Sequence, residues 1–68
     1  MTRYRIEILL KALDKDGTNI SLCFRWARNF MMDDKFIQFT TNNEVNILIR
    51  TEEIIYMRTK EEPHVQTY

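Results

Sequence analysis

The feature that most constrains this chain is a regular alternation of apolar residues in two neighbouring segments. The first segment carries Tyr4, Ile6, Ile8, Leu10 and Ala12 at every second position, and the second carries Ile20, Leu22, Phe24 and Trp26. A period of two places these side chains on one face of a β-strand. Between the segments lies Asp14-Lys15-Asp16-Gly17, whose residues favour turns, including a positive φ at the glycine. The pattern predicts a β-hairpin from Tyr4 to Trp26.

The hairpin register follows from bringing the two apolar faces together. The predicted pairs are Ala12 with Ile20, Leu10 with Leu22, Ile8 with Phe24 and Ile6 with Trp26. On the other face this register sets Glu7 opposite Arg25, a favourable pair, and Leu9 opposite Cys23. A slip of one residue would turn each apolar set to the wrong face.

A helix over about 21–35 is the alternative for the second segment. Leu22, Trp26 and Phe30 recur every four residues, and Thr18 or Asn19 could cap such a helix. This reading makes the fold α+β. The alternation through Cys23 and Phe24 favours the strand, because a helix does not explain it.

A second hairpin is predicted from Lys35–Thr40 and Glu44–Arg50 around Thr41-Asn42-Asn43, since Asn tolerates a positive φ. Its predicted pairs, Ile37 with Ile47 and Phe39 with Val45, give a buried face; a two-residue Asn-Asn turn would shift them. The connection Arg28–Asp34 breaks the alternation and is expected to be a loop or one helical turn. Its Phe30, Met31 and Met32 are expected at the edge of the core, with an exposed binding patch as the alternative.

Thr51-Glu52-Glu53 predicts a Thr-capped helical turn, followed by a last strand over Ile54–Arg58. Two hairpins, a short 3-10 turn and a closing strand resemble, in element order, the small barrels of the SH3-like and Sm-like type. The resemblance implies an all-β, five-stranded antiparallel meander that closes into a barrel or a strongly curved sheet. Residues 1–59 are expected to form one domain and residues 60–68 a flexible tail.

The size and composition of the chain limit its class. A domain of 68 residues is near the lower limit for a self-sufficient core, so a modest stability or oligomerisation is expected. The sequence contains no run long and apolar enough for a membrane helix and no signal segment, which favours the cytoplasm. The single cysteine agrees with a reducing compartment.

The charges are distributed unevenly along a chain whose net charge is zero. Residues 1–28 carry six basic and three acidic residues, 6 − 3 = +3, and residues 29–68 carry four and seven, 4 − 7 = −3. Such a split indicates ordinary solvated charges, internal complementarity, head-to-tail association or a basic face for an acidic partner. The residues of the possible basic face, for nucleic acid or an acidic protein, are Arg3, Arg5, Lys11, Arg25 and Arg28.

The residues that carry chemistry do not form a catalytic or metal-binding pattern. The Asp14–Ile20 stretch fails as a calcium loop, because its first and last ligands would be Ala12 and Cys23. Cys23 and His64 are the only residues of their types, and their spacing has no zinc signature. An apolar setting for Cys23 beside Leu9 argues against a nucleophile. We therefore expect no enzyme, no cofactor, no metal and no small-molecule substrate.

The sequence predicts a second apolar face, opposite the core, ringed by charged residues. Its residues are Leu9, Cys23, Phe36, Leu48, Ile55 and Met57. An apolar centre with a polar rim is typical of a protein interface; a second minor core is the alternative. The expected function is a non-catalytic module that binds a protein or associates with itself, with nucleic-acid binding second. By analogy of size, small regulatory or inhibitory proteins of phages and mobile elements have this character.

Overall fold

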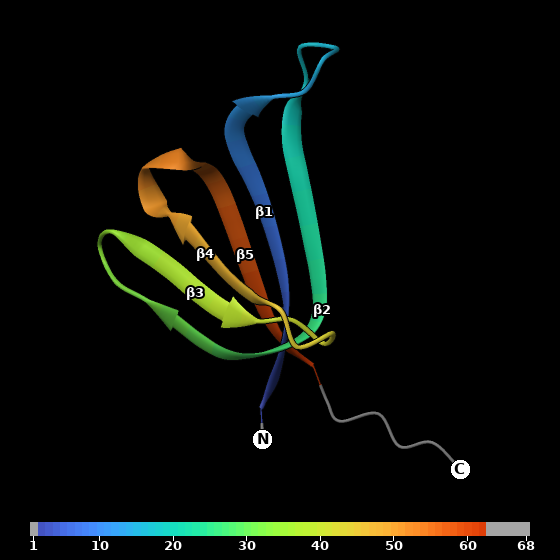
Figure 1. Cartoon of the computed structure of the whole chain (residues 1–68), viewed down its shortest axis with the longest axis vertical. Helices are drawn as coiled ribbons and strands as arrows, with labels where there is room; N and C mark the ends of the chain where they lie inside the picture. Colours follow the sequence, from blue (N-terminus) through green and yellow to red (C-terminus); the bar gives the residue numbers. More distant parts are fainter. Residues whose placement is uncertain (1, 63–68) are drawn as a thin grey trace.

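A computed structural model describes residues 2–62, which form one antiparallel sheet of five strands (Figure 1). The elements are β1 (Arg3–Leu13), β2 (Asn19–Met32), β3 (Phe36–Thr40), β4 (Asn46–Arg50), a 3-10 turn η1 (Thr51–Glu53) and β5 (Ile54–Glu62). The strand order is β4-β3-β2-β1-β5, so β1 lies between β2 and β5, while β4 and β5 are the edges. The all-β prediction is confirmed. The alternative helix over 21–35 is wrong, because those residues belong mainly to β2.

The long strand β2 joins the two halves of the sheet. Its first part pairs with β1 and its last part with β3, and Figure 1 shows the ribbon bending sharply between them. Irregularities in pairing occur at the bend, where Trp26 and Asn29 have φ of 55° and 57°. Such bulges bend a strand and increase its twist. Phe30, Met31 and Met32 therefore continue β2, and the predicted loop or helical turn over Arg28–Asp34 is wrong except at its end.

The first hairpin keeps the predicted faces but not the predicted register. Next to the turn the register is the predicted one: Leu13 pairs with Asn19, as a three-residue loop over 15–17 requires. Farther from the turn, Ile8 pairs with Leu22 and Ile6 with Phe24, and each partner lies two residues from the predicted one. The difference arises between Leu9 and Leu13, where β1 has extra residues. The side-chain amide of Asn19 donates to the carbonyl oxygens of Leu10 and Lys11 in this stretch. A shift of two preserves which side chains face the core.

The second hairpin shows the same kind of difference. Ile37 pairs with Ile49 and Phe39 with Ile47, so the apolar face is as predicted, but the predicted partner Val45 is 52% exposed in the loop. The loop residue with a positive φ is Glu44, at 66°, instead of an Asn.

The core lies between the two halves of the bent sheet. Its fully buried side chains come from three strands and are Ile6, Ile8, Ala27, Ile37 and Phe39. The rings of Phe24 and Phe39 meet edge to face at 5.1 Å between centroids, and Tyr4 lies 5.9 Å from Phe30. The bulge at Trp26 places Ala27 in the core where simple alternation predicted Trp26, and the small side chain suits the sharp bend.

The chain end and η1 differ in detail from the sequence prediction. The 3-10 turn is confirmed, but no side chain caps it; Thr51 instead donates its hydroxyl to the Asp34 carbonyl oxygen at 2.8 Å. Strand β5 extends to Glu62, which pairs with Arg3. The tail predicted to begin at residue 60 is therefore wrong for residues 60–62, and residues 63–68 lie outside the described part of the chain.

Candidate functional site

The predicted apolar face divides between the two halves of the sheet. Phe36 and Leu48 lie on the outer side of β3 and β4, 38% and 61% exposed. Leu9 and Cys23 lie on the outer side of β1 and β2, and each is a neighbour of Glu7. Ile55 is exposed at the point where the pairing register of β1 with β5 shifts. Met57 was assigned wrongly: it pairs with the buried Ile8 and packs against the core.

Met31, Gln38 and Leu48 form a row across three neighbouring strands on the outer side of the sheet. Met31 pairs with Gln38, which pairs with Leu48, and the two apolar residues are 63% and 61% exposed. Together with polar neighbours they line an open groove of about 410 Å³, whose residues are Asn29, Met31, Gln38, Thr40, Asn46, Ile47 and Leu48. We call this surface the β4 groove. Its lining contains no charged side chain, which makes it suited to burial against protein.

The groove ends at the free edge of β4. Within residues 2–62 this strand pairs only with β3, so its other backbone edge joins no ladder. Its sequence Asn46-Ile47-Leu48-Ile49 carries no charge until Arg50. An uncharged edge strand offers its backbone groups to an additional strand. Alternation in the sequence predicts Leu48 on this side. The expectation that Phe30, Met31 and Met32 lie at the edge of the core holds for Phe30 and is wrong for Met31 and Met32, which are 63% and 59% exposed, so the alternative of an exposed patch applies to these two.

Most of the predicted basic face is engaged within the molecule. Arg5 pairs with Glu7 at 3.1 Å, Arg25 with Glu62 at 2.8 Å, and Arg28 with Glu44. Arg3 donates to the Trp26 carbonyl oxygen at 3.1 Å. Among residues 2–62, Lys11 alone of the five makes no such contact. The predicted pair of Glu7 with Arg25 is wrong, since Glu7 pairs across the strands with Cys23.

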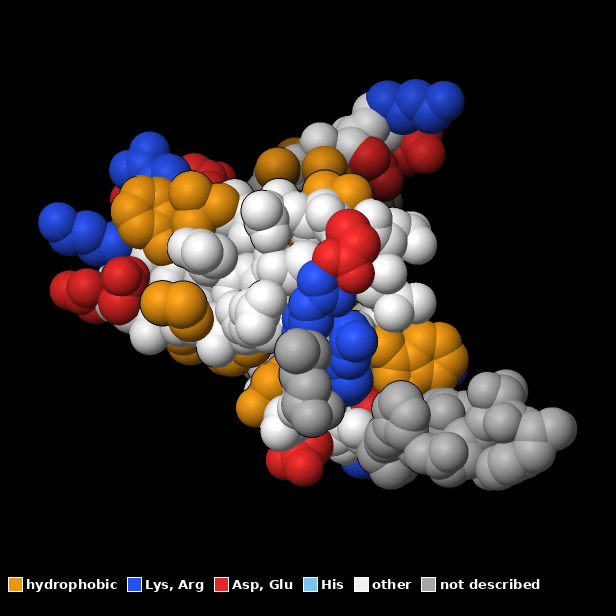
Figure 2. All heavy atoms as spheres, turned by 60° about the horizontal axis from the view of Figure 1, so that its bottom comes forward, with side chains coloured by type: hydrophobic (Ala, Val, Ile, Leu, Met, Phe, Trp, Pro, Cys, Tyr) orange, Lys and Arg blue, Asp and Glu red, His pale blue; other side chains and the backbone are white. Residues whose placement is uncertain are grey.

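Figure 2 shows the consequence for the surface: over this side of the molecule, acidic and basic side chains lie next to one another and the hydrophobic groups form separate clusters. On this side the basic and acidic side chains are mixed, and the hydrophobic groups do not form one continuous face.

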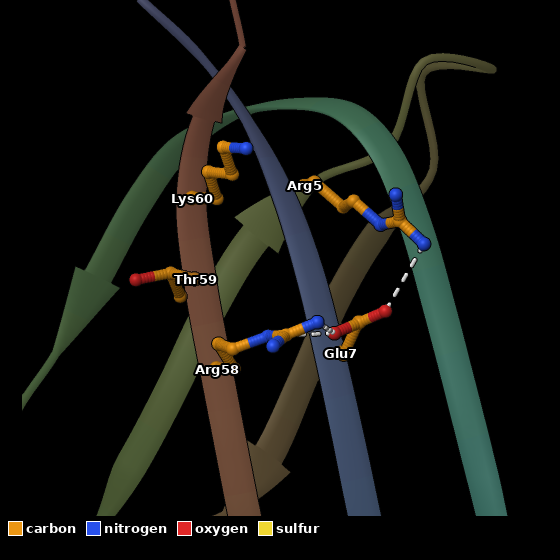
Figure 3. A pocket seen from close by; sticks show the side chains of 5 residues that line it. All are labelled: Arg5, Glu7, Arg58, Thr59 and Lys60. Carbon is orange, nitrogen blue, oxygen red and sulfur yellow. Dashed lines mark hydrogen bonds and ion pairs between the residues drawn. The ribbon is translucent and has the colours of Figure 1, made fainter.

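Strand β5 contributes basic residues that the sequence did not place with the hairpin. The pairing of β1 with β5 sets Arg5 opposite Lys60 and Glu7 opposite Arg58. These four residues and Thr59 line a shallow depression of about 290 Å³ (Figure 3). Glu7 lies between the two guanidinium groups, accepting from Arg58 Nε at 2.9 Å and from Arg5 Nη2 at 3.1 Å. The hydrogen bond from Arg58 is the main cause that lowers the pKa of Glu7, so its carboxylate is charged at neutral pH.

The structure adds two facts about chemistry and membranes. In the described range, residues 2–62, His, Cys, Asp and Glu side chains form no group of three that could bind a metal ion. Cys23 is exposed, and His64 lies outside that range. The helical content of residues 2–62 is the short η1, and none of it is long enough to cross a membrane.

Comparison with known proteins gave no match to a protein-family model, to a curated protein or to a solved structure.

Proposed function

We propose that the protein is a non-catalytic module that acts by protein association, and that its partner at the β4 groove is a second copy of the chain. The observation that supports this is the exposed Met31–Gln38–Leu48 row beside the edge strand β4, which carries no charge before Arg50 and whose outer edge joins no ladder within residues 2–62. Strand addition at such an edge supplies main-chain hydrogen bonds, and the neighbouring apolar row supplies buried area.

The β4 strand is complementary to itself. In an antiparallel two-fold pairing centred on Leu48, each Leu48 lies opposite its copy, Ile47 lies opposite Ile49, and Asn46 lies opposite Arg50. No like charges meet within the strand. Ile47 and Ile49 pack at the margin of the core and remain partly exposed, so the second copy would cover them. Such cross-strand apolar pairs are the units that stabilise a sheet.

The other edge strand, β5, is less suited to the same two-fold pairing over its basic part. Two-fold registers centred on Arg58 or Lys60 set each of those residues against its own copy, and the register centred on Thr59 sets Arg58 against Lys60. Like charges directly opposite one another destabilise a sheet, and charged residues are a common protection of edge strands. The contrast between the edges favours β4 as the site of association.

The test is the solution mass measured by light scattering over a dilution series. We expect a dimer for the wild type at high concentration and a folded monomer for Leu48→Lys, because two lysines would then face each other at the two-fold axis. Leu13→Lys is the matched control: Leu13 is 59% exposed at the far end of β1, so this variant should dimerise like the wild type. Circular dichroism verifies that both variants fold.

Two results would contradict the proposal. A wild type that stays monomeric at the highest concentration excludes self-association. A dimer that survives Leu48→Lys but is lost in Leu13→Lys places the interface elsewhere.

A further inference from the structure

The depression between β1 and β5 lies on a face that the association proposal does not use. Strands β2 and β3 separate β1 and β5 from β4 in the sheet. The depression is lined by Arg5, Glu7, Arg58 and Lys60 together with Thr59, and Figure 3 shows the charged side chains gathered over the two neighbouring strands. Three cations and one carboxylate give this cluster a net charge of 3 − 1 = +2.

Glu7 binds both arginines but leaves some of their N–H donors unused. Each guanidinium carries five N–H donors, and the contacts with Glu7 use Nη2 of Arg5 and Nε and Nη2 of Arg58. The side chains remain 44% and 64% exposed. The unused donors can bind an oxyanion, and the shared carboxylate already restricts the rotamers of both side chains, which reduces the entropy lost on binding.

The surrounding face extends the positive charge. Around the depression, the outer side of β1, β2 and β5 presents five basic residues, Arg3, Arg5, Arg25, Arg58 and Lys60, and two acidic residues, Glu7 and Glu62. The sum is 5 − 2 = +3, in a chain whose formal net charge is zero. The field over this face is therefore positive although the whole molecule is neutral.

An exposed aromatic ring lies on the same face. Tyr56 pairs with Leu9, is 54% exposed, and precedes Arg58 by two residues on β5. Alternate residues of a strand point to the same side and are about 6.7 Å apart. Tyr56, Arg58 and Lys60 thus form a line of one ring and two cations, with Arg5 beside its basic end.

We infer that this β1–β5 face binds single-stranded nucleic acid. Phosphates contact Arg5, Arg58 and Lys60, and a base stacks on Tyr56. A ring beside a basic track is the arrangement that binds unpaired bases without sequence preference. A duplex hides the faces of its bases, so the single strand is the form that uses Tyr56.

The experiment is fluorescence anisotropy with fluorescein-labelled dT12 at increasing salt. With about three phosphates neutralised, the logarithm of the binding constant should fall with the logarithm of salt concentration with a slope of about −2. Arg58→Gln should weaken binding and reduce the magnitude of that slope by about 0.7. Lys15→Gln, which removes the same charge in the β1–β2 loop, is the matched control and should bind like the wild type.

Two further variants separate this site from a general attraction to polyanions. Glu7→Gln removes the competing carboxylate and should strengthen binding several-fold. Tyr56→Leu keeps every charge and should weaken binding about fivefold to tenfold through the lost stacking.

Three results would overturn the inference. They are absence of binding to dT12 at low salt, equal weakening by Lys15→Gln and Arg58→Gln, and unchanged affinity in Tyr56→Leu. The last result would identify an unselective polyanion surface. None of them bears on the association proposal, because Leu48 and the β4 edge take no part in this assay.

Discussion

Single residues with left-handed backbone conformation determine how this chain turns. The loops after β1 and β3 share one design: a side-chain oxygen of Asp14 or Thr41 accepts from the backbone N–H of Thr18 or Val45, four residues later. The left-handed residue precedes that N–H in each loop; it is Gly17 in the first and Glu44 in the second. Sequence reasoning identified the glycine by its conformational freedom. It missed Glu44, because the residue that contacts its side chain, Arg28, is distant in the sequence and no neighbouring residue marks the position.

A substitution at Gly17 therefore tests backbone strain alone, because the new Cβ would clash with no other atom. Its φ is +79°, and a Cβ built on it would meet no atom within 4 Å. Gly17→Ala should lower the free energy of unfolding by about 1 kcal/mol, since a non-glycine residue is strained in this region. Gly17→Asn should cost less, because Asn tolerates the conformation best. Urea denaturation monitored by circular dichroism measures both; equal stability of Gly17→Ala and the wild type would contradict the explanation.

At the scale of elements, β2 shows what alternation can and cannot predict. The period of two identified the five strands and the core faces of Ile6, Ile8, Ile37 and Phe39, but not the end of β2 over residues 28–32 or the end of β5 over residues 59–62. It could not locate the bulges, because an extra residue depends on how two distant strands fit around one core and leaves no local signature in Trp26 or Asn29. The same limit explains the candidate site: Leu48 was predicted, Met31 was expected at the core edge with exposure only as the alternative, and Met57 was assigned to the wrong face.

The bulge at Asn29 can be tested directly. Asn29 is exposed with a φ of 57°, a region that glycine and Asn adopt and β-branched residues avoid. Asn29→Val should lower the free energy of unfolding by about 1–2 kcal/mol, whereas Asn29→Gly should stay within about 0.5 kcal/mol of the wild type. Both are measured by urea denaturation. If Val is as stable as Gly, then β2 does not need the left-handed residue to bend toward β3.

At the scale of the whole molecule, basic residues of the first chain half pair with acidic residues of the second. Arg25 pairs with Glu62 and Arg28 with Glu44. The pair of Glu7 with Arg58 also joins the halves, with the charges reversed. Of the explanations that the charge split offered, the structure shows internal complementarity. The sequence could not name the partners, since these depend on the strand order and on the two-residue shift in the β1–β2 register.

The paired carboxylates make the stability of the molecule sensitive to acid. Hydrogen bonds lower the pKa of four of them, chiefly from Arg58 to Glu7, from the Phe36 backbone N–H to Asp33, from Arg28 to Glu44 and from Arg25 to Glu62. A group whose pKa is lowered by folding stabilises the fold in full at pH values above its ordinary pKa, which is 4.5 for Glu and 3.8 for Asp. That contribution is lost as the pH falls toward the folded-state pKa.

The urea midpoint should therefore be nearly constant from pH 7 to pH 5 and fall steadily between pH 4.5 and pH 3. Glu62 is the sharpest probe, because its side chain is 11% exposed and accepts from both Arg25 and the Trp26 backbone N–H. Glu62→Gln should lower the midpoint at pH 7 and converge on the wild type as the pH falls through the lowered pKa of Glu62, because the wild-type side chain then becomes neutral as well. Glu53→Gln, at the exposed η1 turn, should follow the wild-type curve throughout. A constant difference between Glu62→Gln and the wild type at every pH would mean that Glu62 acts through packing and not through its charge.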